Sequence, residues 1–216
     1  MRKLSAKCVP KCLNVDQKRQ RCQSSEQFLE FFRRDRNDFL SRLVTMEEIW
    51  LYHYDLKTKQ QSMEWRHTGT TKPTPSKKRV QKSAGKVLAS ILWDQEGILL
   101  TDYLSKDQTI NAEYYSSLLV QLKDILKEKR REKLNKGVSF LHDNAQAHRA
   151  IATQETPYLG FQCLDHPHYS PDMAPSDYRL FPGLKKQLKD RHFSSDAKVI
   201  AAAETWLDGQ ISEFFF

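Results

Sequence analysis

Apolar residues in the first part of the chain recur at three- and four-residue spacing, which is the period of an amphipathic helix. The pattern runs from Asp16 to about Val44, and polar residues at 36–38 interrupt it, so it predicts two helices. The aromatic, β-favouring run 49–54 follows and predicts a strand, with 60–65 expected to return beside it as a hairpin partner. The chain is therefore expected to open with helices and to continue into a sheet.

Strands and helices alternate over the rest of the chain. Residues 86–93 and 98–104 predict a hairpin, and Asn111 is placed to cap the long helix that follows. The later expected elements are a strand at 138–142, a helix at 145–155 stopped by Pro157, a strand at 161–164, a loop at 167–175, and helices at 182–190 and 196–209. This order of elements predicts an α/β layer fold with a mixed sheet.

Composition and charge narrow the class of protein. A length of 216 residues suits one substantial domain. The sequence holds no apolar run of about eighteen residues, so a membrane-spanning helix is not expected. The N-terminus lacks the apolar core of a secretion signal, which favours an intracellular protein. The formal net charge of +8 favours a polyanionic partner such as DNA or RNA, although it does not choose between them.

The segment 68–86 differs in composition from its surroundings, because it is rich in Gly, Pro and basic residues and has no apolar period. We interpret it as an extended basic loop that contacts phosphates or clamps a partner subunit. A solvated loop without a partner explains the composition equally well. The residues expected to contact DNA are Lys72, Lys77, Lys78, Arg79 and Lys82.

Acidic residues stand at the ends of predicted elements in three places. The pair 47–48 opens the first predicted strand. Asp143 follows the predicted strand that begins at Val138, and Asp177 follows the Pro-rich loop. Carboxylates that gather at one edge of a sheet suit Mg²⁺, and two such ions about 4 Å apart activate the attacking oxygen and stabilise the leaving one. Without a cation the carboxylates would repel each other and take up protons. Spacing alone is a modest signal, since the chain has 27 acidic residues.

The segments around these carboxylates resemble, in the same order, the three signature segments of mariner-type DNA transposases of the Tc1/mariner superfamily. They are Thr45–Trp50 (TMEEIW), His142–His148 (HDNAQAH) and Tyr169–Tyr178 (YSPDMAPSDY). The resemblance covers nearly the whole chain and implies an RNase H-like fold of the retroviral integrase and transposase type, a mixed sheet flanked by helices. It predicts a linker and N-terminal helices at 1–44 that pack on a catalytic domain at 45–216, with a clamp-like loop at 68–86.

The same resemblance implies a reaction that depends on Mg²⁺ or Mn²⁺. Water attacks a phosphodiester at a transposon end, and the freed 3′-hydroxyl attacks target DNA at a TA dinucleotide. Glu47, Asp143 and Asp177 would be the catalytic residues and the metal ligands. The supporting residues would be Glu48, Asn144 and His148. DNA is the implied partner, a homodimer is left open, a membrane partner is not expected, and the implied location is the nucleus.

The chain departs from the family pattern at several points. Glu47 stands where the family has Asp, and a misplacement of roughly 1 Å costs about a hundredfold in rate. The interval from Asp143 to Asp177 is one residue shorter than usual. The family's paired helix-turn-helix modules are not expected within these residues, and 214–216 is interpreted as an exposed apolar end left by truncation. Three hypotheses follow: an endonuclease and strand transferase of reduced activity, an inactive, domesticated or decayed remnant that binds DNA or another subunit, or a fossil copy with no selected function that folds poorly.

Overall fold

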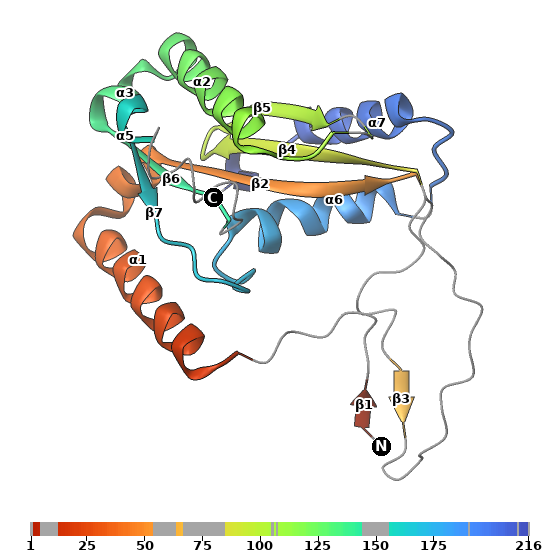
Figure 1. Ribbon diagram of the computed structural model, residues 1–216, viewed down its shortest axis with the longest axis horizontal. Coiled ribbons are helices and arrows are strands. Elements are labelled where there is room, and N and C mark those ends of the chain that lie inside the picture. The colour runs from red at the N-terminus through yellow and green to blue at the C-terminus, as the bar shows by residue number, and fades with distance from the viewer. Residues whose placement is uncertain are drawn as a thin grey trace.

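One mixed sheet with helices on both of its faces forms the body of the protein in a computed structural model (Figure 1). The structure describes residues 2–4, 13–53, 64–66, 85–104, 106, 108–143, 156–189, 191–210 and 212–215. The described strands are β1 (Arg2–Leu4), β2 (Leu43–Tyr52), β3 (Glu64–Arg66), β4 (Lys86–Asp94), β5 (Gly97–Leu104), β6 (Val138–Leu141) and β7 (Phe161–Leu164). The described helices are α1 (Val15–Arg42), α2 (Ala112–Lys129), α3 (Arg131–Lys136), α5 (Thr156–Leu159), the π-helical turn η1 (Ser176–Leu180), α6 (Phe181–Leu188), α7 (Asp196–Asp208) and α8 (Ser212–Phe215).

The main sheet has five strands in the order β5-β4-β2-β6-β7. β2, β4 and β5 pair antiparallel, whereas β6 and β7 run parallel to β2. The predicted hairpin is therefore β4 and β5, joined by a two-residue turn, and it is confirmed together with the mixed sheet flanked by helices. The longest strand, β2, is central and joins the antiparallel half of the sheet to the parallel half.

The two faces of the sheet are covered by different helices. Side chains alternate between faces along a strand, and Val44 and Met46 of β2 pack with α2 in one core cluster. Ile49 and Leu51 point to the other face and pack against α6, α7 and α8. Figure 1 shows this division, with α2 on one side of the sheet and α6 on the other. Burial of both faces accounts for the apolar runs of the central strands.

Helix α1 packs on the same face as α6, but at the parallel end of the sheet. Phe39 and Leu40 form a cluster there with Leu43 of β2, Leu141 of β6 and Leu164 of β7. This arrangement leaves two helical groups on one face, α1 over the parallel strands and α6 with α7 over the antiparallel strands. The junction between the two groups lies over β2 and β6.

Local sequence signals explain where the helices begin and break. Asn14 caps α1 through a capping box, and its side chain accepts a hydrogen bond from the Gln17 backbone N–H at 2.8 Å. Asn111 caps α2 in the same manner by accepting from the Tyr114 N–H, as predicted. The predicted break in the first helical region is present as a kink at Asp35, where φ is −160° and ψ is 101°. The kink lies one residue before the interval named from the sequence.

Three expectations about the strands and helices were wrong. The helical pattern up to Val44 overran the helix, because β2 already begins at Leu43 and 47–48 lie inside that strand instead of opening it. The hairpin partner of β2 is β4, and the described part of 60–65 belongs to β3, which pairs with β1. The helix expected at 145–155 falls outside the described residues.

Two side chains expected at the surface are buried. Lys133 is charged and would ordinarily lie at the surface, but it is only 5% exposed, and its Nζ lies 2.9 Å from the Asp94 carboxylate. Phe215, assigned to an exposed apolar end, packs its ring 5.3 Å from that of Trp93. Both cases arise because distant segments supply partners that the local pattern does not reveal.

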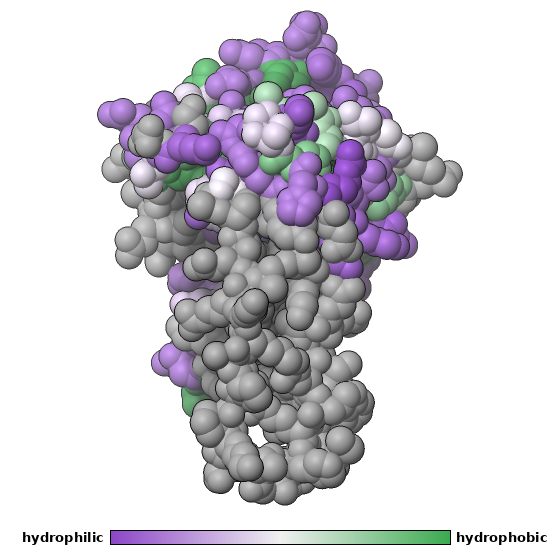
Figure 2. All heavy atoms as spheres, turned by 90° about the vertical axis from the view of Figure 1, so that its right-hand side faces the viewer, coloured by the Kyte–Doolittle hydropathy of each residue, from purple (hydrophilic) through white to green (hydrophobic). Residues whose placement is uncertain are grey.

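The described surface is mixed in character. On the side shown in Figure 2, hydrophilic residues surround small separate hydrophobic patches. Among the described helices, none combines the length and apolar character needed to cross a membrane.

Candidate active site

Glu47 occupies the middle of the central strand, on the face that carries α1 and α6. It pairs with Ile91 of β4, whose side chain belongs to the core beneath α6 and α7. By alternation along β2, Glu47 shares its face with Leu43 on one side and Ile49 on the other. Leu43 packs under α1 and Ile49 under α6 and α7. The carboxylate of Glu47 therefore lies at the junction between the two helical groups.

Asp143 is brought beside Glu47 by the parallel pairing of β2 and β6. Thr45 pairs with Leu141, the last residue of β6. Glu47 and Asp143 each stand two residues further along in the same direction, so the register carries both past the same point of the sheet. The parallel register thus accounts for two of the three predicted carboxylates meeting.

Asp177 reaches the same place from a helical turn that lies outside the sheet. It belongs to η1, and its backbone N–H donates to the Ala174 carbonyl at 3.0 Å. The preceding residue, Ser176, is fully buried, and its hydroxyl accepts a hydrogen bond of 2.9 Å from the Trp93 indole N–H. This bond fixes the start of the turn against the core of β4.

Electrostatics show that the three carboxyl groups form one cluster. Burial and, after it, the negative charges of Asp177 and Asp143 together raise the pKa of Glu47 to about 9. The Glu47 and Asp177 carboxyl groups also share a hydrogen bond. Such a bond between two acidic groups requires a proton between them, so Glu47 is protonated near neutral pH when no cation is present.

Asp177 also has a raised pKa, chiefly because it is buried, although the Lys185 charge opposes the shift. His166 lies close enough to Asp143 and Asp177 for their charges to act on it. Burial nevertheless lowers the pKa of His166. Its ring forms a hydrogen bond with the Ser170 backbone, and its Nε2 is buried without a hydrogen-bond partner among the described residues. A neutral imidazole therefore borders the carboxylate cluster.

Among the described residues, Glu48 is a predicted site residue that the structure does not bring into this cluster. Glu48 pairs with Ser90 and points to the opposite face of the sheet, toward α2. Burial raises the pKa values of the half-buried Tyr114 and the buried Tyr115 there, and the Glu48 charge adds to both shifts. A supporting role for Glu48 would have to act through the sheet. The remaining candidates lie outside the described residues: Asn144, His148, Lys72, Lys77, Lys78, Arg79 and Lys82.

The donor set fits a divalent cation of the Mg²⁺ or Mn²⁺ type. All three side chains supply hard carboxylate oxygens, and burial together with their mutual repulsion raises the pKa of Glu47. Within the described ranges, no three His, Cys, Asp or Glu side chains are close enough to hold an ion as they stand. The three carboxylates would therefore draw together around an ion, with water or a phosphate completing its shell.

Sequence reasoning missed two residues at this site. His166 borders the carboxylates, and Arg21 of α1 forms an ion pair with Asp172 in the loop before η1. His166 stands between a predicted strand and the Pro-rich loop, a position from which side chains reach the edge of a sheet, so its place was accessible to the argument used for Asp143. Arg21 gave no such signal, because it is one of 35 basic residues and its partner lies far away in sequence.

Comparison with known proteins places these features in a family. Residues 55–136 match the family model described as transposase (partial DDE domain). The chain is 33% identical over 211 residues to the mariner Mos1 transposase of Drosophila mauritiana, covering 96% of this chain and 59% of that protein. It is 28% identical over 211 residues to the histone-lysine N-methyltransferase SETMAR of Homo sapiens, covering 97% of this chain and 30% of that protein. The chain thus spans less than two thirds of the length of either curated relative.

The fold agrees with this relationship. The crystal structure of the Mos1 catalytic domain matches with a TM-score of 0.76 at 30% identity, covering 96% of this chain and 89% of that one. The five-stranded mixed sheet is accordingly the RNase H-like fold expected from the signature segments. Both the sequence and the fold show that this chain belongs to the mariner-type transposase family, in which it corresponds to the catalytic domain.

Proposed function

We propose that this protein is a DNA endonuclease and strand transferase that depends on Mg²⁺ or Mn²⁺, with Glu47, Asp143 and Asp177 as its metal ligands. The observation that carries the proposal is the cluster of these three carboxyl groups, in which Glu47 has its pKa raised to about 9. A protein gains nothing in stability from burying carboxylates together. The cluster is explained by a cation that takes the place of the Glu47 proton.

The solved structures that this chain resembles support a divalent cation and DNA. Mos1 paired-end complexes have been solved with Mn and with Mg, and another holds the left transposon end. This chain aligns with each of them over its whole length at 31–32% identity. The formal charge of +8 suits a polyanionic substrate. We extend these features to this chain as part of the proposal, including transposon ends and a TA target as substrates.

The residues have distinct parts in this reaction. Bound divalent cations would promote deprotonation of the attacking water or 3′-hydroxyl and would stabilise the leaving oxygen of the phosphodiester. Glu47 and Asp143, fixed by neighbouring strands, set one side of the site. Asp177 closes it from η1. His166, held neutral by burial, donates its ring N–H to the Ser170 backbone and leaves its Nε2 available to accept a hydrogen bond from a water at the edge of the cluster.

A nicking assay tests the proposal. A labelled, pre-cut transposon-end duplex is incubated with the protein and Mg²⁺ or Mn²⁺, with EDTA as the metal-free control. We expect cleavage that requires the metal and that Asp143→Ala abolishes, while DNA binding in a gel shift stays intact. Asp124→Asn is a matched control, because Asp124 is an exposed residue of α2 that pairs only locally with Lys127. Full cleavage by Asp143→Ala would overturn the assignment of the site.

A second candidate function is a DNA-binding or subunit-interaction module without turnover. The observation that favours it is Glu47 itself, since the family has the shorter Asp at this position and the ligands are not yet close enough to hold an ion. In that case the folded protein would shift DNA but leave it uncut with either metal. Cleavage by the unmodified chain, lost in Asp143→Ala, would exclude this reading.

The cellular setting is also part of the proposal. A DNA substrate carried on chromosomes places the protein in the nucleus, and joining two transposon ends favours a homodimer. Fluorescence microscopy of the tagged chain tests the first statement. Sedimentation of the chain with and without transposon-end DNA tests the second, because a single sedimenting species of monomer mass in both conditions would contradict a homodimer.

A further inference from the structure

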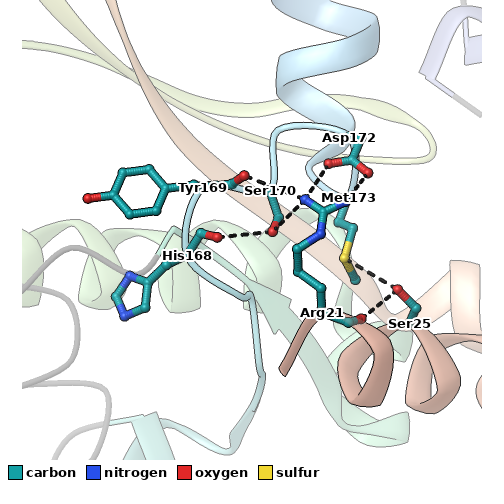
Figure 3. A network of polar contacts seen from close by, with 7 residues as sticks. All are labelled: Arg21, Ser25, His168, Tyr169, Ser170, Asp172 and Met173. Carbon is teal, nitrogen blue, oxygen red and sulfur yellow. Dashed lines mark hydrogen bonds and ion pairs between the residues drawn. The ribbon is translucent and has the colours of Figure 1, made fainter. Parts of the chain in front are cut away.

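Helix α1 holds the loop that leads to Asp177 through one arginine. The Arg21 guanidinium donates from both of its terminal nitrogens to the Asp172 carboxylate, at 3.0 and 2.7 Å (Figure 3). It also donates to the Ser170 hydroxyl at 3.0 Å and, more weakly, to the Tyr169 carbonyl at 3.5 Å. Such a two-pronged contact fixes orientation as well as distance. Arg21 therefore determines where this loop lies relative to α1.

A second contact between α1 and the loop lies one turn further along the helix. The Ser25 hydroxyl donates to the Arg21 carbonyl at 2.7 Å and lies 3.6 Å from the Met173 sulfur (Figure 3). Arg21 and Ser25 stand on the same side of α1, since they are four residues apart. The loop residues they contact, Ser170 to Met173, lie just ahead of η1. The helix thus offers one continuous edge to the loop.

The loop has an independent anchor at its other end. Trp93 of β4 donates to the Ser176 hydroxyl at 2.9 Å. Between this anchor and Asp172 there are only three residues, and Asp177 comes directly after Ser176. The Met173 N–H donates to the Ser170 carbonyl at 2.9 Å, which folds the segment into a turn. Asp177 is therefore placed by a short segment held at two points, one on the sheet and one on α1.

The same loop also places His166. Its ring forms a hydrogen bond with the Ser170 backbone, and Ser170 is the residue whose hydroxyl accepts from Arg21. Tyr169, just before it, has φ of +56°, a conformation that a non-glycine residue keeps only when its surroundings impose it. The contacts of Arg21 with Tyr169, Ser170 and Asp172 supply such surroundings.

We propose that Arg21 is a positioning residue for the metal-dependent reaction, because its contacts with Asp172 and Ser170 fix the loop that sets Asp177 and His166 against Glu47 and Asp143. The inference rests on the proposed function of that carboxylate cluster. Arg21 touches neither DNA nor the metal in this role. It transmits the position of α1 to the third carboxylate, so that the segment before the sheet takes part in shaping the site.

The experiment compares two arginines of the same helix. Arg21→Gln removes the contact with the loop, whereas Arg42→Gln removes an ion pair of 2.9 Å with Asp38 that lies within α1. We expect Arg21→Gln to speed hydrogen exchange of the Met173 and Asp177 amides, weaken Mn²⁺ binding severalfold by paramagnetic resonance, and lower the cleavage rate by about tenfold to a hundredfold. Arg42→Gln should leave amide exchange, Mn²⁺ binding and the cleavage rate close to the values of the unmodified protein.

Two further variants separate positioning from general stability. Arg21→Lys keeps the positive charge but loses the planar guanidinium that donates two parallel hydrogen bonds. Its Mn²⁺ binding should therefore lie between that of Arg21→Gln and that of the unmodified protein. Asp172→Asn removes the partner, and the double variant with Arg21→Gln should be no worse than the more affected single one, because both act through one contact. Equal thermal midpoints for Arg21→Gln and Arg42→Gln would show that any difference in rate arises at the site.

The outcomes distinguish this proposal from the proposed function. If the unmodified protein binds Mn²⁺ and cleaves DNA but Arg21→Gln matches Arg42→Gln in exchange, binding and rate, the positioning role is overturned. If the unmodified protein neither binds Mn²⁺ nor cleaves, the proposed function fails. Hydrogen exchange of the Met173 and Asp177 amides still reports in that case on the contact between Arg21 and the loop. Unchanged exchange in Arg21→Gln would then overturn the positioning role as well.

Discussion

Replacing Glu47 with Gln should stabilise the metal-free protein at alkaline pH and abolish most of the pH dependence of its unfolding. Burial and the neighbouring charges of Asp177 and Asp143 raise the pKa of Glu47 from 4.5 to about 9. The folded protein therefore keeps a proton that the unfolded chain releases. For a carboxyl group with a raised pKa, the stabilising contribution is complete below the unfolded value and is lost as the pH rises through the folded one.

The expected size follows from one proton. A difference of one bound proton changes the free energy of unfolding by about 1.4 kcal/mol for each pH unit. Between about pH 7 and about pH 8.5 the unmodified protein should lose about 2 kcal/mol, or roughly 4–8 °C in its thermal midpoint for a domain of this size. This window avoids His166, whose pKa is lowered from 6.5, so that its effect on stability falls at lower pH.

Thermal unfolding followed by circular dichroism in EDTA measures this slope. Glu47→Gln should be nearly flat over the window, because an amide cannot ionise and can still form a hydrogen bond with Asp177. Glu128→Gln, an exposed change on α2, is the matched control and should keep the slope of the unmodified protein. Mn²⁺ should also flatten the pH dependence of stability in the unmodified protein, since the cation replaces the Glu47 proton. A Glu47→Gln variant with an unchanged slope would refute the reasoning.

Three other changes test separate parts of the structure. Glu47→Asp should raise the rate of metal-dependent nicking, because it restores the family residue, and an equal or lower rate would show that Glu47 is not the weak point. Lys133→Met should cost about 3 kcal/mol in urea unfolding, because it removes the 2.9 Å partner of the fully buried Asp94; a loss below about 1 kcal/mol would contradict this. Trp93→Phe should cost about 1–2 kcal/mol through the unpaired Ser176 hydroxyl and speed exchange of the amides that follow it, and unchanged exchange would argue against this anchor.

The parts of the fold that were predictable are those with strong local signals. The β4–β5 hairpin has a two-residue turn between apolar runs, and α2 begins at a capping Asn with a clear apolar stripe behind it. The parallel strands β6 and β7 were also found, because short apolar runs bounded by turn residues mark them. In each case the chain settles its conformation within about a dozen residues.

Pairing and burial between distant segments were not predictable in this way. The start of β2 follows a helix without a turn residue between them, so the helical pattern ran on into the strand. The partner of β2 lies beyond the segment 54–63, and the nearer candidate at 64–65 pairs elsewhere. Lys133 is buried beside two partners far away in sequence, the Asp94 carboxylate and the Leu43 carbonyl.

The site shows the same division. Glu47, Asp143 and Asp177 were found from their signature segments, and the register of β2 with β6 explains why the first two meet. Glu48, predicted as a supporting residue, faces away from them, since adjacent strand residues point to opposite faces. Arg21 was invisible because its role arises only when α1 lies against the loop before η1.

The substitution of Glu for Asp at position 47 has a structural consequence for the whole cluster. The longer side chain moves its carboxylate outward from β2 by about one bond, roughly 1.5 Å. Asp143 cannot follow, because the parallel pairing of β6 with β2 fixes it just past the last paired residues. Asp177 can follow, because it belongs to a turn outside the sheet that is held by side-chain contacts at Ser176 and Asp172 instead of by strand pairing. Any accommodation of Glu47 therefore has to come from the loop that Arg21 holds, and Arg21 and Glu47 should be energetically coupled even though they lie on different elements.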